Sequence, residues 1–200
     1  MKKSTLLIAL LLATTAGFAQ ESRQDVSLSA NAWVQPQANG NAVSQNATIS
    51  LGALASYRFM LTPRGALEAN YSFTQDVQKY IAANFLNGYR IHSRMQEATA
   101  AYVLSFNYKN FNPFVEVGGG GVLFTPINDF RTTSLGAKSE TSIAGLWGFG
   151  IAYELSPSFD LRVQYRALVL KTPSFGNFDE NNTNTYNNIS MPAVGIAYHF

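Results

Sequence analysis

The feature that most constrains the fold of this chain is an alternation of apolar with small or polar residues, which recurs in eight separate segments. Successive side chains of a β-strand point to opposite faces, so a period of two indicates strands with two different faces. We expect these strands at residues 26–34, 47–59, 67–74, 97–106, 115–123, 142–154, 161–169 and 193–200.

The charged residues show which environment each face meets. The apolar face carries no charge, and the small or polar face carries Arg58, Glu68, Glu97, Glu116, Arg162 and Arg166. A soluble sandwich or a lipocalin-like barrel has the reverse arrangement, with its charges outside. If the apolar columns faced inward, a small barrel would have to hold about five large side chains from every strand, which exceeds its interior. The apolar face therefore meets lipid, where one Arg or Lys near the midplane costs about 2–4 kcal/mol.

The connections between the segments indicate the topology. Short connections are expected at residues 60–64, 109–113 and 155–158, and long ones at residues 35–46, 75–94, 125–139 and 172–188. Short periplasmic turns, longer outer loops and an even strand number are typical of outer-membrane barrels. The sequence thus predicts an all-β fold, an eight-stranded antiparallel up-and-down transmembrane β-barrel with both chain ends on the periplasmic side.

The first residues read as an export signal. Lys2 and Lys3 precede an apolar run from Leu6 to Leu12, and small residues follow before residue 20. This run is too short to span a bilayer, which disfavours the alternative of an uncleaved anchor helix. We expect a cleaved signal peptide at residues 1–19 and an outer-membrane β-barrel domain at residues 20–200.

The composition narrows the possible functions. The chain has no cysteine, so it can form no disulfide framework, thiol nucleophile or thiolate metal site. Its net charge of +2 argues against a nucleic-acid binder. Only 13% of its residues are charged, roughly half the usual share of a soluble domain, which suits a protein surrounded by lipid.

Residues 113–124, PFVEVGGGGVLF, contain four consecutive glycines. A phosphate-binding loop needs Gly-Lys-Ser/Thr at the start of a helix, and a flexible linker does not have apolar residues on both sides. The glycines instead continue the alternation of a membrane-spanning strand. We expect Gly118 and Gly120 to leave room in the lumen for the long side chain of Arg162 or Arg166.

The chain resembles the small eight-stranded outer-membrane barrels of the OmpA membrane domain and OmpX kind. The resemblance covers essentially the whole mature chain and rests on the signal, the loop alternation, the PFVEVGGG strand and the ending VGIAYHF. It implies a bacterial outer-membrane location, a lipid surrounding and handling by the barrel-assembly machinery. The last strand, with Tyr198 and the terminal Phe200, is similar to the assembly signal of this family. An architecture of this kind specifies no particular activity.

The inward polar side chains form the candidate site. The predicted lumen network comprises Arg58, Glu68, Glu97, Glu116, Arg162, Gln164 and Arg166, with Thr99 and Ser72 on the same face. Eight strands leave an interior just wide enough for side chains to fill, which favours a closed polar plug over an ion path. Glycosidases also use paired carboxylates, but the arginines are the more fitting partners here.

We expect no catalytic residue, metal site or cofactor. His92 and Ser93 invite comparison with outer-membrane barrels that modify lipid A, one type of which uses a His, a Ser and an acid. Nucleophilic catalysis needs these groups within hydrogen-bond reach, whereas adjacent residues of a strand point to opposite faces. His199 is the other histidine, and two distant histidines make no metal site.

The predicted function is a structural and surface-interaction role, with a closed lumen and with any specificity in the outer loops. A narrow passive pore, or a carrier for small solutes including hydrophobic compounds, is the alternative, followed by a lipid-modifying enzyme. The connection 75–94 is unusually apolar, with Tyr80, Ile81 and Phe85. It either docks a surface ligand or consists of strands that extend beyond the membrane.

Overall fold

The structure is a computed structural model that describes residues 23–82, 89–133, 136–176 and 183–200. The predicted signal peptide lies outside these residues. The strands are β1 (Gln24–Gln35), β2 (Ala38–Gly40), β3 (Val43–Gln45), β4 (Thr48–Met60), β5 (Gly65–Ala82), β6 (Tyr89–Ser105), β7 (Phe111–Pro126), β8 (Glu140–Ser156), β9 (Phe159–Lys171) and β10 (Tyr186–His199). Within the described residues, no helix is long and apolar enough to cross a membrane.

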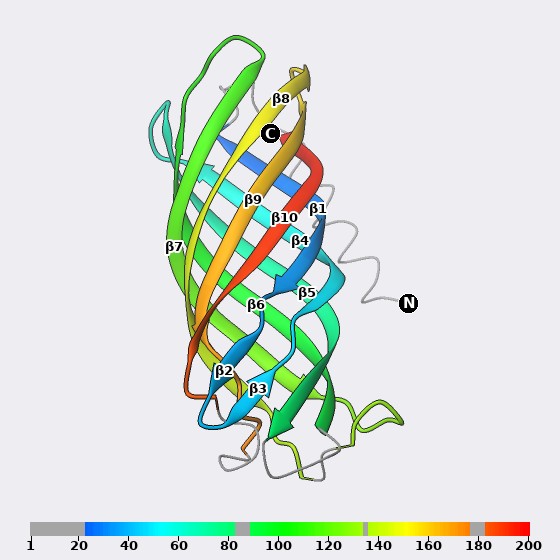
Figure 1. Ribbon diagram of the computed structural model, residues 1–200. Helices are drawn as coiled ribbons and strands as arrows, with labels where there is room; N and C mark the ends of the chain where they lie inside the picture. Colours follow the sequence, from blue (N-terminus) through cyan, green and yellow to red (C-terminus); the bar gives the residue numbers. More distant parts are fainter. Residues whose placement is uncertain (1–22, 83–88, 134–135, 177–182) are drawn as a thin grey trace, which may run out of the picture.

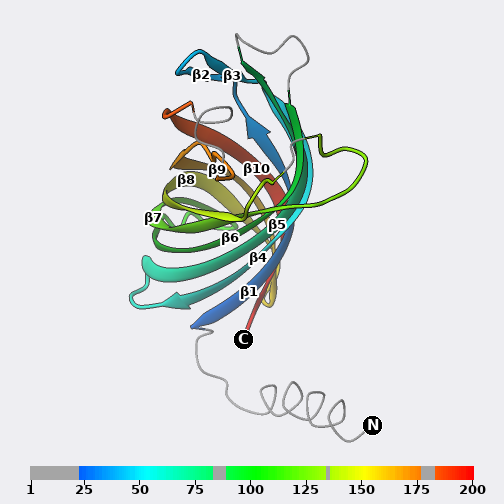
Figure 2. The ribbon, with the colours of Figure 1, turned by 90° about the horizontal axis from the view of Figure 1, so that it is seen from below.

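The eight long strands form a closed antiparallel ring (Figures 1 and 2). Its order is β5, β4, β1, β10, β9, β8, β7, β6, and the pairing of β6 with β5 closes it. Each strand pairs with its neighbours in sequence, and β1 pairs with β10. The predicted fold class is therefore confirmed, and each of the eight predicted segments corresponds to one long strand.

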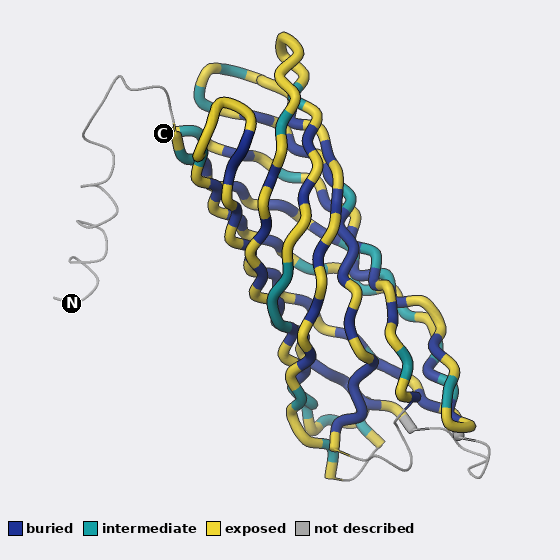
Figure 3. The backbone as a smooth tube through the Cα atoms, turned by 90° about the vertical axis from the view of Figure 1, so that its left-hand side faces the viewer, coloured by how far each residue is buried: buried dark blue, intermediate teal, exposed yellow. Residues whose placement is uncertain are grey.

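The two faces of the strands are divided as the alternation predicts. Along β4, Leu51 and Phe59 are exposed on the outside, whereas Arg58 is buried in the lumen. Figure 3 shows this alternation of buried and exposed residues along the barrel wall. From Ile49 to Phe59 the strand advances about 33 Å, and at a tilt of about 40° this spans an apolar band of about 25 Å.

The predicted long loop at residues 75–94 is wrong for most of its length. β5 continues to Ala82 and β6 begins at Tyr89, and these extensions pair up to Tyr80 opposite Tyr89. Hydrogen bonds to the neighbouring strand stabilise the extension of β5, because Asp76 accepts from the hydroxyls of Thr48 and Ser50 on β4. Here the alternative of strands that extend beyond the membrane is correct.

The first outer connection contains a small hairpin. β2 pairs with β3, and β3 pairs with the extension of β5, with Gln45 opposite Tyr80. The tight turn requires a positive φ at Asn41 (50°) and Ala42 (60°). In Figure 1 this hairpin lies at the lower end of the barrel, away from the C-terminus.

The lumen contains two layers of different chemistry. The half near the short turns is polar and charged, as predicted. The outer half is filled mainly by a buried apolar cluster, among which Gln35, Gln45 and Gln78 are also buried. The cluster includes Trp33, Val43, Tyr80, Ile91, Met95, Val122, Phe124, Leu146, Leu168, Leu170, Phe175, Ile189 and Met191. The prediction of a purely polar plug is therefore incomplete, because the inward positions near the outer strand ends are apolar as well.

Candidate functional site

The first ion-pair group of the lumen is centred on Arg162 of β9. Its Nη2 donates to Oδ1 of Asp25 on β1 at 2.9 Å, and its Nη1 lies 3.4 Å from Oε2 of Glu68 on β5. Arg58 of β4 donates to the same Glu68 oxygen, from Nε at 2.8 Å. All four side chains are buried. The group joins β9 to β5, which lies on the opposite side of the ring.

The second group is centred on Arg166, which lies two inward positions further along β9, beyond Gln164. Its Nη2 donates to Oε1 of Glu97 on β6 at 2.8 Å and to Oγ1 of Thr99 at 3.2 Å. Its Nε lies 3.3 Å from Oε1 of Glu116 on β7. Thr99 also donates to Glu97 at 2.8 Å. Two arginines of one strand thus bridge the lumen to acids on four other strands.

Space for these groups comes from two glycines of β8. A Cβ on Gly148 would lie 2.5 Å from Oε1 of Glu116, and a Cβ on Gly150 would lie 2.5 Å from the ring of Phe114. The Phe114 ring in turn lies under the guanidinium carbons of Arg58 and Arg162, which are 4.8 and 5.8 Å from its centroid. Bare backbone on β8 therefore lets the β7 side chains fill the lumen.

The expected role of Gly118 and Gly120 is wrong. The nearest atoms to a Cβ on either residue belong to the backbone of β6, where it would overlap the carbonyl oxygens of Ala100 and Ala98. These glycines allow a close approach of β7 to β6, and the arginine side chains do not determine the available space.

The structure brings together six of the seven residues of the predicted network. Gln164 lies in the lumen wall, but its amide has no hydrogen-bond partner among the described residues. Sequence reasoning missed Asp25, which binds Arg162. The sequence did contain a sign of its role. Asp25 is two residues before Ser27 and so lies on the same inward face, one residue before the predicted start of the strand.

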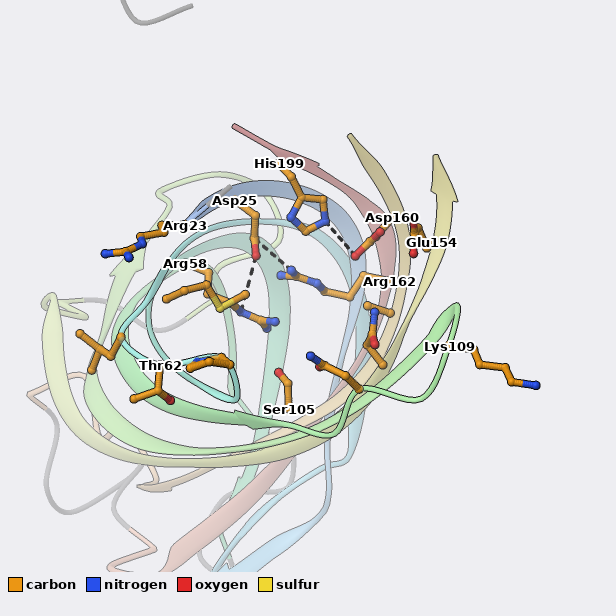
Figure 4. A pocket seen from close by; sticks show the side chains of 16 residues that line it. Arg23, Asp25, Arg58, Thr62, Ser105, Lys109, Glu154, Asp160, Arg162 and His199 are labelled. Carbon is orange, nitrogen blue, oxygen red and sulfur yellow. Dashed lines mark hydrogen bonds and ion pairs between the residues drawn. The ribbon is translucent and has the colours of Figure 1, made fainter. Parts of the chain in front are cut away.

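The periplasmic mouth of the barrel holds a cavity of about 550 Å³. Figure 4 shows Arg58 and Arg162 pointing from its wall toward Asp25, and His199 pointing toward Asp160. Nε2 of His199 lies 2.8 Å from Oδ2 of Asp160. The cavity ends at the first ion-pair group, because Asp25, Arg58 and Arg162 form part of its lining.

The outer end of the lumen is closed by Phe175 from the last outer connection. Its ring is fully buried and packs edge-on against Tyr80 and Phe124, at centroid distances of 6.4 and 6.2 Å. Glu140 of β8 holds this segment, because its Oε2 accepts hydrogen bonds from the backbone N–H groups of Ser174 and Phe175, both at 2.7 Å. Phe175 adopts a φ of +53°, which is uncommon for a bulky residue.

The two residues that suggested hydrolase chemistry are not paired. Nδ1 of His92 lies 2.8 Å from Oδ2 of Asp129 in the third outer connection. Ser93 belongs to the inward face of β6, where it stands opposite Asp76. Across the described residues, no group of three or more His, Cys, Asp or Glu side chains could hold a metal ion.

The C-terminal strand ends in an aromatic rim. The ring of Tyr198 stacks on Phe200 at 6.1 Å and contacts Phe159 at 5.1 Å. The backbone N–H of Phe200 donates to the carbonyl of Gln24 at 3.0 Å, which joins the chain end to β1. Both rings of the predicted assembly signal are exposed on the outside of the barrel.

Comparisons with known proteins agree with this architecture. Neisserial surface protein A is 13% identical, with a TM-score of 0.58 over 88% of this chain and 97% of that one. OprG of Pseudomonas aeruginosa is 12% identical, with a TM-score of 0.55 over 90% and 97%. Ail of Yersinia pestis is 12% identical, with a TM-score of 0.53 over 90% and 100%.

These solved structures share the fold with this chain. No curated protein matches its sequence. The model of the outer membrane protein beta-barrel domain matches residues 5–200, nearly the whole chain. The bacterial outer membrane is thus the location of this protein, and the chain belongs to the outer membrane protein beta-barrel domain family.

Proposed function

We propose that this protein is a closed outer-membrane barrel with a structural role, which interacts with other surface components through its outer connections. The observation that carries the proposal is the contact of Arg162 with Glu68 across the full width of the ring. An ion that follows the lumen would have to separate this pair, and breaking a buried ion pair costs about 3–5 kcal/mol.

The apolar layer gives independent support. An ion that passes the charged layer meets an apolar cluster in which Phe175 packs on Tyr80 and Phe124. The few polar groups there, such as Gln35, Gln78 and the Tyr80 hydroxyl, are hydrogen-bonded to one another, so the ion would lose most of its hydration without replacement. Two barriers of opposite chemistry therefore lie in series along one lumen.

Conductance of the refolded protein in planar lipid bilayers tests this proposal. We expect no unitary conductance from the wild type, and none from Arg162→Ala alone, because the apolar layer remains. The combined substitution Arg162→Ala/Phe175→Ala is expected to conduct. Wild-type channels of a defined unitary conductance would overturn the proposal.

The interaction role rests on the outer connections. One solved neighbour, Ail of Yersinia pestis, was crystallised with the heparin analogue sucrose octasulfate. We infer that the outer connections of this chain present a surface for an extracellular ligand. Binding of the refolded protein to sulfated glycan arrays, with and without protease trimming of the outer connections, tests this role.

The apolar layer also favours a second candidate function, a carrier for small hydrophobic compounds. Such a compound would replace Phe175 among Tyr80 and Phe124. Cells that express the wild type would then take up the apolar probe N-phenylnaphthylamine faster than cells that express a variant whose last outer connection is fixed, so that Phe175 cannot leave the lumen. A disulfide between cysteines placed at Lys138 and Gly176, where a Cβ on Gly176 would lie 3.4 Å from that of Lys138, supplies that lock. Because Gly176 has a φ of +77°, the reduced form of the same variant is the reference for uptake.

We propose outer-membrane lipid and the barrel-assembly machinery as partners, the latter through Tyr198 and Phe200. The proposal includes no enzymatic activity, cofactor or metal. The separation of His92 from Ser93 on opposite faces of β6 supports this part of it. An unchanged mass of lipid A after expression of the protein is the expected result, and a new lipid A species would contradict it.

A further inference from the structure

A group of cations lies on the outside of the barrel at the outer ends of β5 and β6. The outward side chains there include Lys79, Arg90 and Arg94, all exposed. We call these three residues, together with Arg131 of the neighbouring outer connection, the basic outer patch. Within the described part of the chain, none of the four side chains forms an ion pair within 4 Å. The acid beside the patch is Asp129, whose carboxylate is held by His92 and by the backbone N–H of Arg131.

The arrangement of the patch is unfavourable for the isolated protein. Lys79 stands directly opposite Arg90 in the β5–β6 register. Like charges at directly opposite positions on one face of an antiparallel pair destabilise it. An anion bound between Lys79 and Arg90 would remove this repulsion, so their pairing favours an anionic ligand.

The height of the patch places it at a membrane surface. On the same outward face of β5, Leu67, Tyr71 and Phe73 are exposed below it and belong to the apolar band. The guanidinium carbon of Arg94 lies 5.9 Å from the centroid of the Phe73 ring. At a tilt of about 40°, residues two to six positions beyond Phe73 lie roughly 5 to 15 Å further toward the outer end of the barrel, which places Lys79 and Arg90 at the outer edge of the apolar band, next to the lipid headgroups.

The third outer connection adds an apolar group to the patch. Residues 127–133 are tied to β6, because the N–H of Ile127 donates to the carbonyl of His92 at 2.7 Å and that of Thr133 donates to Arg90 at 2.8 Å. The segment presents Phe130, which is 87% exposed, beside Arg131 at 5.5 Å. An aromatic ring next to a cation is typical of protein groups at a lipid interface.

We infer that the basic outer patch is a docking surface for the phosphate groups of an anionic lipid in the outer leaflet. Four observations support a lipid over a soluble polyanion. The strand residues of the patch point outward from the barrel wall, the patch lies at the outer edge of the apolar band, Arg94 packs on a ring of that band, and the exposed Phe130 ring lies beside Arg131. The inference does not depend on whether the lumen is closed.

Native mass spectrometry of the refolded protein in detergent tests this inference, with diphosphoryl lipid A and its dephosphorylated form as probes. We expect the wild type to retain diphosphoryl lipid A in preference to the dephosphorylated form. The variant Arg90→Gln/Arg94→Gln should retain roughly 30-fold less, since it removes two cations and each cation near an anionic lipid surface contributes about 1 kcal/mol. Arg131→Gln, in the connection and outside the barrel wall, should show a smaller loss and tests the patch without a substitution in a strand.

The matched control is Arg64→Gln/Lys171→Gln, which removes the same charge from two exposed positions outside the patch. Heat-modifiable migration in gels verifies that every variant is folded. An equal loss in the control, or full retention by the patch variants, would overturn the inference. Loss of heparin binding in the patch variants with unchanged lipid A retention would also overturn it, because the patch would then serve a soluble polyanion.

Discussion

Arg162 and Glu68 lie on opposite walls of the barrel and contact each other through its centre, with 3.4 Å between Nη1 and Oε2. Strands β10, β1 and β4 separate their strands on one side of the ring, and β8, β7 and β6 on the other. The contact is possible because an eight-stranded barrel is only as wide as two extended side chains.

Removal of Arg162 is expected to destabilise the barrel strongly. Arg162→Ala leaves Asp25 and Glu68 buried with fewer partners, which should lower the free energy of unfolding by about 3–5 kcal/mol. Urea unfolding in detergent or lipid vesicles measures this. The exposed Arg64 serves as the control, and equal stabilities of Arg162→Ala and Arg64→Ala would contradict the ion-pair account.

Two glycines of β8 should respond differently to the same substitution. A Cβ at Gly148 would meet Oε1 of Glu116 at 2.5 Å, so Gly148→Ala should cost about 1–3 kcal/mol of stability through overpacking. At Gly145, on the outward face of the same strand, the nearest atom is the carbonyl oxygen of Val169 at 3.9 Å. Gly145→Ala should therefore be close to neutral, and a larger loss there than at Gly148 would refute this comparison.

Glu140 should determine whether the last outer connection stays in the lumen. Glu140→Ala removes the acceptor for the N–H groups of Ser174 and Phe175 and for the Ser174 hydroxyl. We expect faster cleavage of the connection by an added protease, while the strands remain intact. Glu154→Ala, at the other end of β8, is the control, and indistinguishable cleavage of the two variants would count against the contact.

The third outer connection should loosen in acid. Desolvation opposes ionisation of Asp129, but hydrogen bonds from His92 and from the N–H of Arg131 outweigh it, so the pKa of Asp129 lies below its ordinary value of 3.8. A lowered folded-state pKa means that the stabilisation is complete above 3.8 and is lost as the pH falls through the lowered value. Hydrogen-exchange protection of Thr133 should decrease over this range.

Asp129→Asn supplies the control for this acid response. The amide cannot ionise, so protection of Thr133 in this variant should be lower at neutral pH and change little in acid. A wild-type profile that parallels that of Asp129→Asn would exclude the carboxylate as the cause.

Phe200 is expected to matter for assembly more than for stability. Its ring is exposed at the rim, so Phe200→Ala should unfold at nearly the wild-type urea concentration after refolding in vitro. In cells, the same variant should reach the outer membrane in smaller amounts. Phe59→Ala removes another exposed ring at the same end of the barrel, and an equal shortfall for that variant would argue against a terminal signal.

The sequence alone determined the number of long strands, their inward and outward faces and the lipid surroundings. The physical reason is local: a strand alternates its side chains with a period of two, and charge is tolerated on only one side of a membrane wall. The alternation alone therefore places Arg58, Glu68 and Arg162 inside the barrel. Asp25 follows the same parity and was missed only because the strand begins earlier than its apolar run.

The tertiary structure decided which inward residues meet. The alternation predicts that Arg162 and Arg166 both face the lumen. Strand tilt and register decide that Arg162 reaches Asp25 and Glu68, whereas Arg166 reaches Glu97. The same registers bring Gly148 beside Glu116 and place Lys79 opposite Arg90. Phe175 is buried because inward apolar residues of several distant strands, among them Tyr80 and Phe124, lie at the same height in the barrel. The alternation within a single segment does not show at which height its residues lie.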